Sequence, residues 1–166
     1  MLNRQFGFTI AAVVFALDQL TKWIVAGPLE LQTVRQIVLL PIFNLSWTEN
    51  NGISLGLLNA ETEIGRWMLV ALTAGIAIGV AVWLGREKQR GDQLALGMVL
   101  GGALGNILDR IRFGYVVDFA DLHFGTFRPF LVFNVADAAI SIGVVILLLR
   151  AFLIRDERPK ENVEHA

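Results

Sequence analysis

Four long apolar stretches, separated by polar segments, make up most of the chain. The second stretch, Trp67 to Leu84, runs for 18 residues without a charge. As a helix it would be about 27 Å long, close to the ~30 Å hydrocarbon core of a bilayer. The other three reach that length only by including ionisable residues, which usually face a bundle interior or a water-filled cavity. The pattern therefore predicts four membrane spans, at about residues 6–26, 66–84, 93–112 and 130–150.

Two long links join these spans on one side, at residues 27–65 and 113–129. In the first link Phe43, Leu45 and Trp47 alternate with polar residues, and this period of two predicts a strand. We expect a small sheet resting on the membrane surface, with Trp47 as an interfacial anchor. The alternative is a partner-binding loop without fixed structure. The predicted fold class is an all-α polytopic membrane protein, with four transmembrane helices and a small extracytoplasmic β-sheet cradle.

Composition supports a membrane location. Of the 166 residues, 55% are hydrophobic and only 17% are charged, whereas about a quarter of a soluble domain is charged. The mean hydropathy is +0.59. A net charge of −1 and the absence of cysteine argue against a nucleic-acid-binding module, a disulfide scaffold and any thiol-dependent site.

The distribution of Lys and Arg predicts the orientation. Eight of the 14 basic residues lie in the first five residues, in the short link at 85–93 and from Arg150 onward. The positive-inside rule places these segments, and so both termini, in the cytoplasm. We expect one membrane-embedded domain over residues 1–154 and a polar cytoplasmic tail over 155–166. A secretory signal peptide is the alternative for the first stretch, but no clear cleavage site follows it.

Glycines at four-residue spacing predict close helix contacts, because small residues let two backbones approach in lipid. The third span carries Gly97, Gly101 and Gly105, and the second carries Gly75 and Gly79.

With this orientation, polar residues gather near the outer ends of the spans. They are Asp18, Asn50, Asn106, Asp109, Arg110, Asp118, Asn134 and Asp137. If the fourth span starts at Phe130, Asp137 lies roughly 10 Å below the surface. Asp18 and Lys22 share a helix face at i, i+4 and should form an ion pair, as an inert support or as part of a site. Carboxylates gathered at one depth in lipid indicate a functional site.

The residue types limit the chemistry. The chain has only two histidines, His123 and His165, so we expect no metal site, no cofactor and no Ser–His dyad. Two close carboxyls cannot both ionise easily, so one keeps a proton while the other activates water. Asp137 is the first candidate, Asp118 the second and Asp109 the third. Asp109 also suits an ion pair or a helix-end contact.

Two other classes of function remain open at this point. A small transporter would need polar residues that continue toward the cytoplasm, and spans two and four offer only Thr73 and Ser141. A scaffold protein would explain the glycines but not the carboxylates with their asparagine neighbours.

Five segments carry a resemblance to a known family. They are DQLTK at 18–22, FNL at 43–45 with NNGI at 50–53, GGALGNILDR at 101–110, GYVVDF at 114–119 and FNVAD at 133–137. In this order they resemble the lipoprotein signal peptidases, also called signal peptidase II. Ser54-Leu55 departs from the Ala-Phe that the family often has there, and this concerns local substrate contacts.

The resemblance implies an intramembrane aspartyl endopeptidase of the bacterial inner membrane, with its active site near the periplasmic face. Its substrate would be a diacylglyceryl-modified prolipoprotein, cut just before the lipidated cysteine, and globomycin would inhibit it. By motif position the catalytic residues would be Asp118 and Asp137. The substrate-binding and supporting residues would be Asn50, Gly52, Asn106, Asp109, Arg110, Asn134, Asp18 and Lys22. The expected partners are this substrate and membrane lipid, with no nucleic acid, no metal and a monomeric enzyme.

Overall fold

The computed structural model describes residues 5–52 and 62–154. The expectations for the tail at 155–166, for the basic residue Arg4 and for Ser54-Leu55 lie outside these ranges. In the described part of the chain, four helices are long and apolar enough to cross a membrane. They are α1 (Gln5–Ala26), α3 (Glu63–Arg86), α4 (Arg90–Arg112) and α5 (Val135–Ile154). The prediction of four spans is confirmed.

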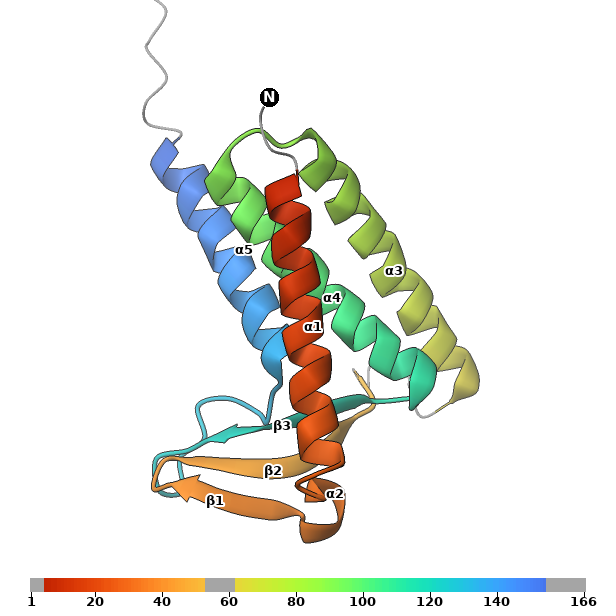
Figure 1. Ribbon diagram of the computed structural model, residues 1–166, viewed down its shortest axis with the longest axis vertical. Helices are drawn as coiled ribbons and strands as arrows, with labels where there is room; N and C mark the ends of the chain where they lie inside the picture. Colours follow the sequence, from red (N-terminus) through yellow and green to blue (C-terminus); the bar gives the residue numbers. More distant parts are fainter. Residues whose placement is uncertain (1–4, 53–61, 155–166) are drawn as a thin grey trace, which may run out of the picture.

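Helix α4 is the centre of the bundle and contacts α1, α3 and α5 (Figure 1). Its glycines explain the close packing. A Cβ atom at Gly97 or Gly101 would meet the backbone carbonyls of Gly7 and Ala11 in α1. On another face of α4, a Cβ atom at Gly102 would lie 2.5 Å from a backbone oxygen of α5. The contacts predicted for the α4 glycines are therefore confirmed.

The equivalent prediction for the second span is wrong. Apart from its neighbours in the α3 backbone, a Cβ atom at Gly75 or Gly79 would have no heavy atom within 4 Å. These glycines face open space in the described structure, so they make no close helix contact. A GxxxG spacing requires a partner helix on the same face, and α3 packs on α4 through other residues, including Val70, Ala77 and Leu84.

A three-stranded antiparallel sheet covers one end of the bundle (Figure 1). Its strands are β1 (Gln36–Leu40), β2 (Phe43–Asn50) and β3 (Val116–Leu122), in that order, and a four-residue helix, α2 (Leu31–Val34), precedes them. The N-terminal end of α1, the α3–α4 link and the C-terminal end of α5 lie at the opposite end of the bundle. The predicted strand is β2, and the predicted sheet is confirmed.

Helix α5 begins five residues later than predicted, at Val135 instead of Phe130. Two interactions fix this start. The backbone of Phe133 pairs with that of Ala120 in β3, so residue 133 is not available to a helix. Asn134 then caps the helix, because its Oδ1 accepts from the backbone N–H of Asp137 at 2.9 Å while the Asp137 carboxylate accepts from the N–H of Asn134 at 3.3 Å. Asp137 therefore lies in the first turn of α5, and the depth inferred from Phe130 is not supported.

Trp47 is not an interfacial anchor. Its ring is buried between the sheet and the helices, in a cluster with Leu31 and Phe119, and its indole N–H donates to Glu49. The exposed apolar residues of the sheet are instead at the β1–β2 turn, namely Val38, Leu39, Leu40 and Ile42.

Candidate active site

Two carboxylates, Asp118 on β3 and Asp137 on α5, are joined by a network of asparagine side chains. The Nδ2 atom of Asn134 donates to Oδ1 of Asp118 at 2.6 Å, and Asn50 donates to Oδ2 of the same carboxylate at 3.0 Å. Asn106 donates to Oδ1 of Asp137 at 2.8 Å. Asn134 also donates to Asn106 at 3.2 Å, so the two carboxylates belong to one hydrogen-bonded unit.

Local backbone geometry holds Asn50 in this network. Its Oδ1 accepts from the backbone N–H of Gly52 at 2.9 Å, which forms a turn at the end of β2. Gly52 has a φ of 99°, a conformation that L side chains rarely adopt. The prediction of Gly52 as a site residue therefore has a structural reason, because this turn aims the Asn50 amide at Asp118.

Both carboxylates face one cavity of about 720 Å³. Asp118 is almost fully buried, with 1% of its surface exposed, whereas Asp137 is partly exposed to the cavity. The rest of the lining is mostly apolar: residues 129–133 from the link before α5, then Ala138, Ser141 and Ile142 along the helix. The cavity thus combines a polar end at the carboxylates with an apolar flank that follows α5.

Burial raises the pKa of Asp118 from its usual 3.8 to about 7. Desolvation is the main cause, and the negative charge of Asp137 is the second. The hydrogen bonds from Asn50 and Asn134 favour the ionised form, but they do not outweigh these two effects. Near neutral pH, Asp118 therefore holds a proton for a substantial fraction of the time.

A buried ion cluster lies next to this network and supports it. Lys22 on α1, only 4% exposed, contacts Asp18 at 2.9 Å and Asp109 of α4 at 2.7 Å, and it donates to Asn106 at 3.2 Å. The predicted Asp18–Lys22 pair is confirmed. The ion pair expected for Asp109 is also present, and its partner is Lys22. Buried charges require such pairing, because isolated ions are strongly disfavoured away from water.

The ion cluster also holds the elements that carry the two carboxylates. Asp18 accepts from the backbone N–H of Ala136 at 3.0 Å, one residue before Asp137. Asp109 accepts from the backbone N–H of Val117 at 3.2 Å, one residue before Asp118. The cluster therefore fixes the positions of α5 and β3 relative to each other. Gly105 makes room for it, because a Cβ atom there would collide with the Asp18 carboxylate.

Arg110 lies on the last turns of α4, close to both carboxylates. Its guanidinium interacts electrostatically with Asp137, Asp118 and Asp109. One Nη atom is 3.4 Å from the backbone oxygen of Asn106, and the buried Nε atom has no hydrogen-bond partner within the described ranges. The guanidinium therefore places its positive charge next to the carboxylate network.

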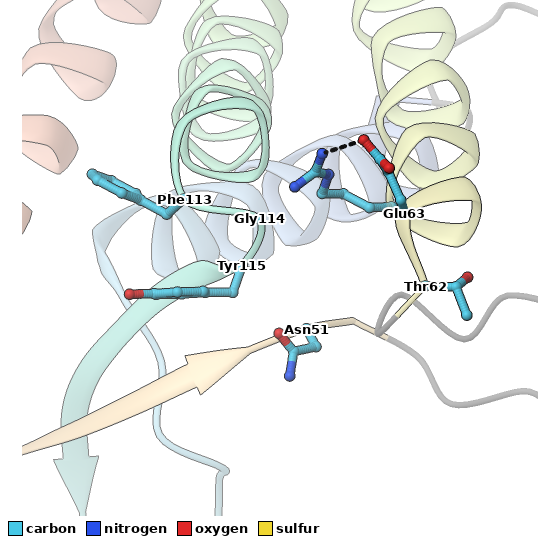
Figure 2. Close-up of a pocket in the computed structure, with 7 residues that line it drawn as sticks. Asn51, Thr62, Glu63, Phe113, Gly114 and Tyr115 are labelled. Carbon is cyan, nitrogen blue, oxygen red and sulfur yellow. Dashed lines mark ion pairs between the residues drawn. The ribbon is translucent and has the colours of Figure 1, made fainter.

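A second pocket, of about 440 Å³, lies between the start of α3 and the link from α4 to β3. Figure 2 shows Phe113, Gly114 and Tyr115 on one side of it and Thr62 and Glu63 on the other. Arg66 pairs with Glu63 here at 3.6 Å. This pocket shares no lining residue with the cavity at Asp118 and Asp137, so it is separate from the carboxylate network.

The ten site residues expected from the sequence all belong to one connected region at the sheet end of the bundle. The sequence analysis missed Gln19, which donates to Asp109 at 3.0 Å and to Asp18 at 3.2 Å. Its position within the segment at 18–22 was the available signal. The apolar wall at residues 129–133 was also missed, because the sequence pattern places residues 130–133 in the fourth span. Within residues 5–52 and 62–154, no group of three His, Cys, Asp or Glu side chains could hold a metal ion.

Comparison with known proteins agrees with this geometry. The model of the family described as signal peptidase (SPase) II matches residues 10–153. The chain belongs to the signal peptidase II family. A lipoprotein signal peptidase of Sphingopyxis alaskensis is 58% identical over 92% of this chain and 88% of its own length. One from Brevibacillus brevis is 44% identical over 88% of this chain and 94% of its own length.

The fold comparison points to the same class. A bacterial membrane enzyme solved by the in meso method at 2.3 Å resolution aligns with a TM-score of 0.75 and 30% identity, over 93% of this chain and 92% of the other. Signal peptidase II enzymes are aspartic peptidases that cleave the signal peptides of prolipoproteins in the membrane. The resemblance inferred from the five motifs is confirmed.

Proposed function

We propose that this chain removes the signal peptide from diacylglyceryl-modified prolipoproteins, with Asp118 and Asp137 as the catalytic pair, and that it cuts just before the lipidated cysteine. One observation carries this proposal: the two carboxylates share a single cavity and a single asparagine network. Burial first, and the charge of Asp137 second, raise the pKa of Asp118 toward neutrality, as an aspartic peptidase needs.

The exposure of the two groups supports a division of roles. Asp137 is the more accessible carboxylate, so water reaches it from the cavity and it acts as the base. Water adds to the amide carbonyl carbon as Asp137 takes a proton, and Asp118 supplies the proton that the departing amine needs when the C–N bond breaks. Arg110 interacts electrostatically with both groups, so its charge is suited to stabilise the negative charge that develops on the carbonyl oxygen of the substrate.

The cavity shape fits a lipidated substrate. Ser141 and Ile142 extend the lining by more than one helical turn beyond Asp137, so an apolar flank continues along α5 from the polar end. An acyl chain attached next to the scissile amide would lie against this flank. Exposed apolar residues at the β1–β2 turn, including Val38 and Leu39, are suited to contact membrane lipid. We propose that the enzyme acts as a monomer, since one chain supplies every group of the site.

We also propose that the sheet end faces the periplasm and both termini face the cytoplasm. The α3–α4 link lies opposite the sheet and carries Arg86, Lys88 and Arg90, which the positive-inside rule places in the cytoplasm. The chain has no cysteine, so single-cysteine variants report topology without background. In spheroplasts, an impermeant maleimide should label Thr33→Cys and spare Lys88→Cys, and the reverse pattern would overturn this orientation.

The catalytic assignment is tested with purified protein and a diacylglyceryl-modified precursor. Asp118→Asn and Asp137→Asn should each lower the cleavage rate by about 10²–10⁴-fold, the usual contribution of a general acid or base. Asp92→Asn is the matched control, because this carboxylate pairs with Arg150, away from the cavity. Cleavage by either active-site variant at the wild-type rate would disprove the assigned pair.

A further inference from the structure

One wall of the active-site cavity is attached to the rest of the molecule mainly at its two ends. Residues 129–133 line the cavity and connect β3 to α5. At the far end, Phe133 pairs with Ala120 through backbone hydrogen bonds of 2.7 and 3.0 Å. Between these ends, residues 130–132 belong to no helix or strand, and they make no backbone–backbone hydrogen bond within the described part of the chain. The position of this wall therefore depends on its attachments.

The near end is held by an ion pair between Arg128 and Asp121. The Nε atom of Arg128 lies 3.0 Å from Oδ1 of Asp121, and one Nη atom lies 3.4 Å from Oδ2. Asp121 is only 3% exposed, and Ser46 of β2 donates to it at 3.0 Å. A two-point contact between a guanidinium and a carboxylate fixes direction as well as distance. Asp121 stands three residues after Asp118 on β3, so the wall is tied to the strand that carries a proposed catalytic group.

The charge state of Asp121 favours this contact. Desolvation opposes ionisation, but the hydrogen bonds from Arg128 and Ser46 outweigh it and keep the pKa of Asp121 below its usual value. The carboxylate is thus ionised near neutral pH and the pair persists there. Asp121 does not line the cavity, and none of the hydrogen bonds to Asp118 or Asp137 described above involves it.

We propose that Asp121 and Arg128 are positioning residues that hold the cavity wall at residues 129–133 against the substrate. This inference rests on the proposed function, because it takes the cavity to be the substrate site. When one attachment is lost, the wall occupies its binding position for only part of the time, and the apparent affinity falls by that fraction. The chemical step should change little, since the carboxylate network is untouched.

Steady-state kinetics on the diacylglyceryl-modified precursor test this. Arg128→Gln and Asp121→Asn should each raise KM by about three- to ten-fold, with kcat within about two-fold of wild type. The KM of the double variant should be no higher than that of the single variant with the higher KM, because the two residues act as one unit. Arg128→Lys keeps the positive charge but loses the two-point contact with Asp121. Its KM should lie between those of wild type and Arg128→Gln. Glu63→Gln is the matched control, since it breaks another ion pair outside the cavity and should leave both constants unchanged.

Hydrogen exchange on the substrate-free protein gives an independent readout. The hydrogen-bonded amides of Phe133 and Ala120 at the far attachment should exchange faster in Arg128→Gln than in wild type, with no change in α4. Unchanged exchange and unchanged KM would overturn the positioning role, and so would a fall in kcat at constant KM. If wild-type protein fails to cleave the precursor while exchange at Phe133 and Ala120 still responds to Arg128→Gln, the proposed function is at fault and the wall attachment stands.

Discussion

The raised pKa of Asp118 makes the stability of the protein depend on pH in a specific way. The folded protein holds a proton on this carboxyl up to pH about 7, whereas the usual value of 3.8 applies to the unfolded chain. Between these values the folded state binds more protons, so stability is greatest below pH 3.8 and falls as the pH rises toward 7. From pH 5 to pH 7 this loss amounts to about 2 kcal/mol, because the slope of about 1.4 kcal/mol per pH unit flattens as the pH approaches 7.

Asp118→Asn removes this dependence, because the amide does not ionise. As the pH rises from about 5 to about 8, the free energy of unfolding of the variant should increase by about 3 kcal/mol relative to wild type. This corresponds to about 6–12 °C in Tm for a protein of this size. Any pH-independent effect of the amide, such as a poorer fit to the donors Asn50 and Asn134, cancels when the two pH values are compared.

Thermal unfolding in detergent, followed by tryptophan fluorescence, measures this difference. Titrating groups that do not interact with Asp118 change the Tm of both proteins equally, so the difference between them isolates Asp118 and its coupling to Asp137. Parallel Tm curves for wild type and variant across this pH range would show that Asp118 is ionised in the folded protein, and the argument from burial would fail.

Three further results are expected. The kcat/KM for precursor cleavage should fall as the pH rises through about 7, because Asp118 then loses the proton that it donates; a flat profile from pH 6 to 9 would contradict this. Lys22→Met should destabilise the protein by about 3–5 kcal/mol, measured as a loss of Tm, because two buried carboxylates lose their cation. Gly101→Val should lower Tm strongly, because its Cβ would collide with a backbone carbonyl of α1, whereas Gly79→Val is the control with open space around it. Equal Tm values for these two variants would contradict the packing described for α4.

Much of the architecture could be predicted from local sequence patterns. Hydrophobic length, once ionisable residues within three of the stretches were included, identified the four spans, and the i, i+4 spacing identified the Asp18–Lys22 pair. The role of Asp109 in the same cluster was not predictable, since it depends on how α1 and α4 face each other. The wrong expectation for Gly75 has the same cause: a small-residue spacing does not say whether a partner helix lies on that face.

The boundaries near the site were harder to predict because tertiary contacts decide them. The apolar run from Phe130 reads as part of a span, but the pairing of Phe133 with β3 keeps it out of the helix. Residues 116–122 read as an outer link, yet hydrogen bonds to β2 make them a strand. The spacing of Asn134 and Asp137 was a local signal for the true start of α5, as a reciprocal cap.

This cap gives Asp137 a structural role besides its proposed catalytic one. One carboxylate oxygen accepts from the backbone of Asn134 and the other from the side chain of Asn106, so the group has no freedom to rotate. A reacting carboxylate held in this way reaches its working orientation during folding and needs no rearrangement when substrate arrives. Asp137→Asn keeps a side-chain oxygen that can accept from the backbone of Asn134, whereas Asp137→Ala would also fray the first turn of α5.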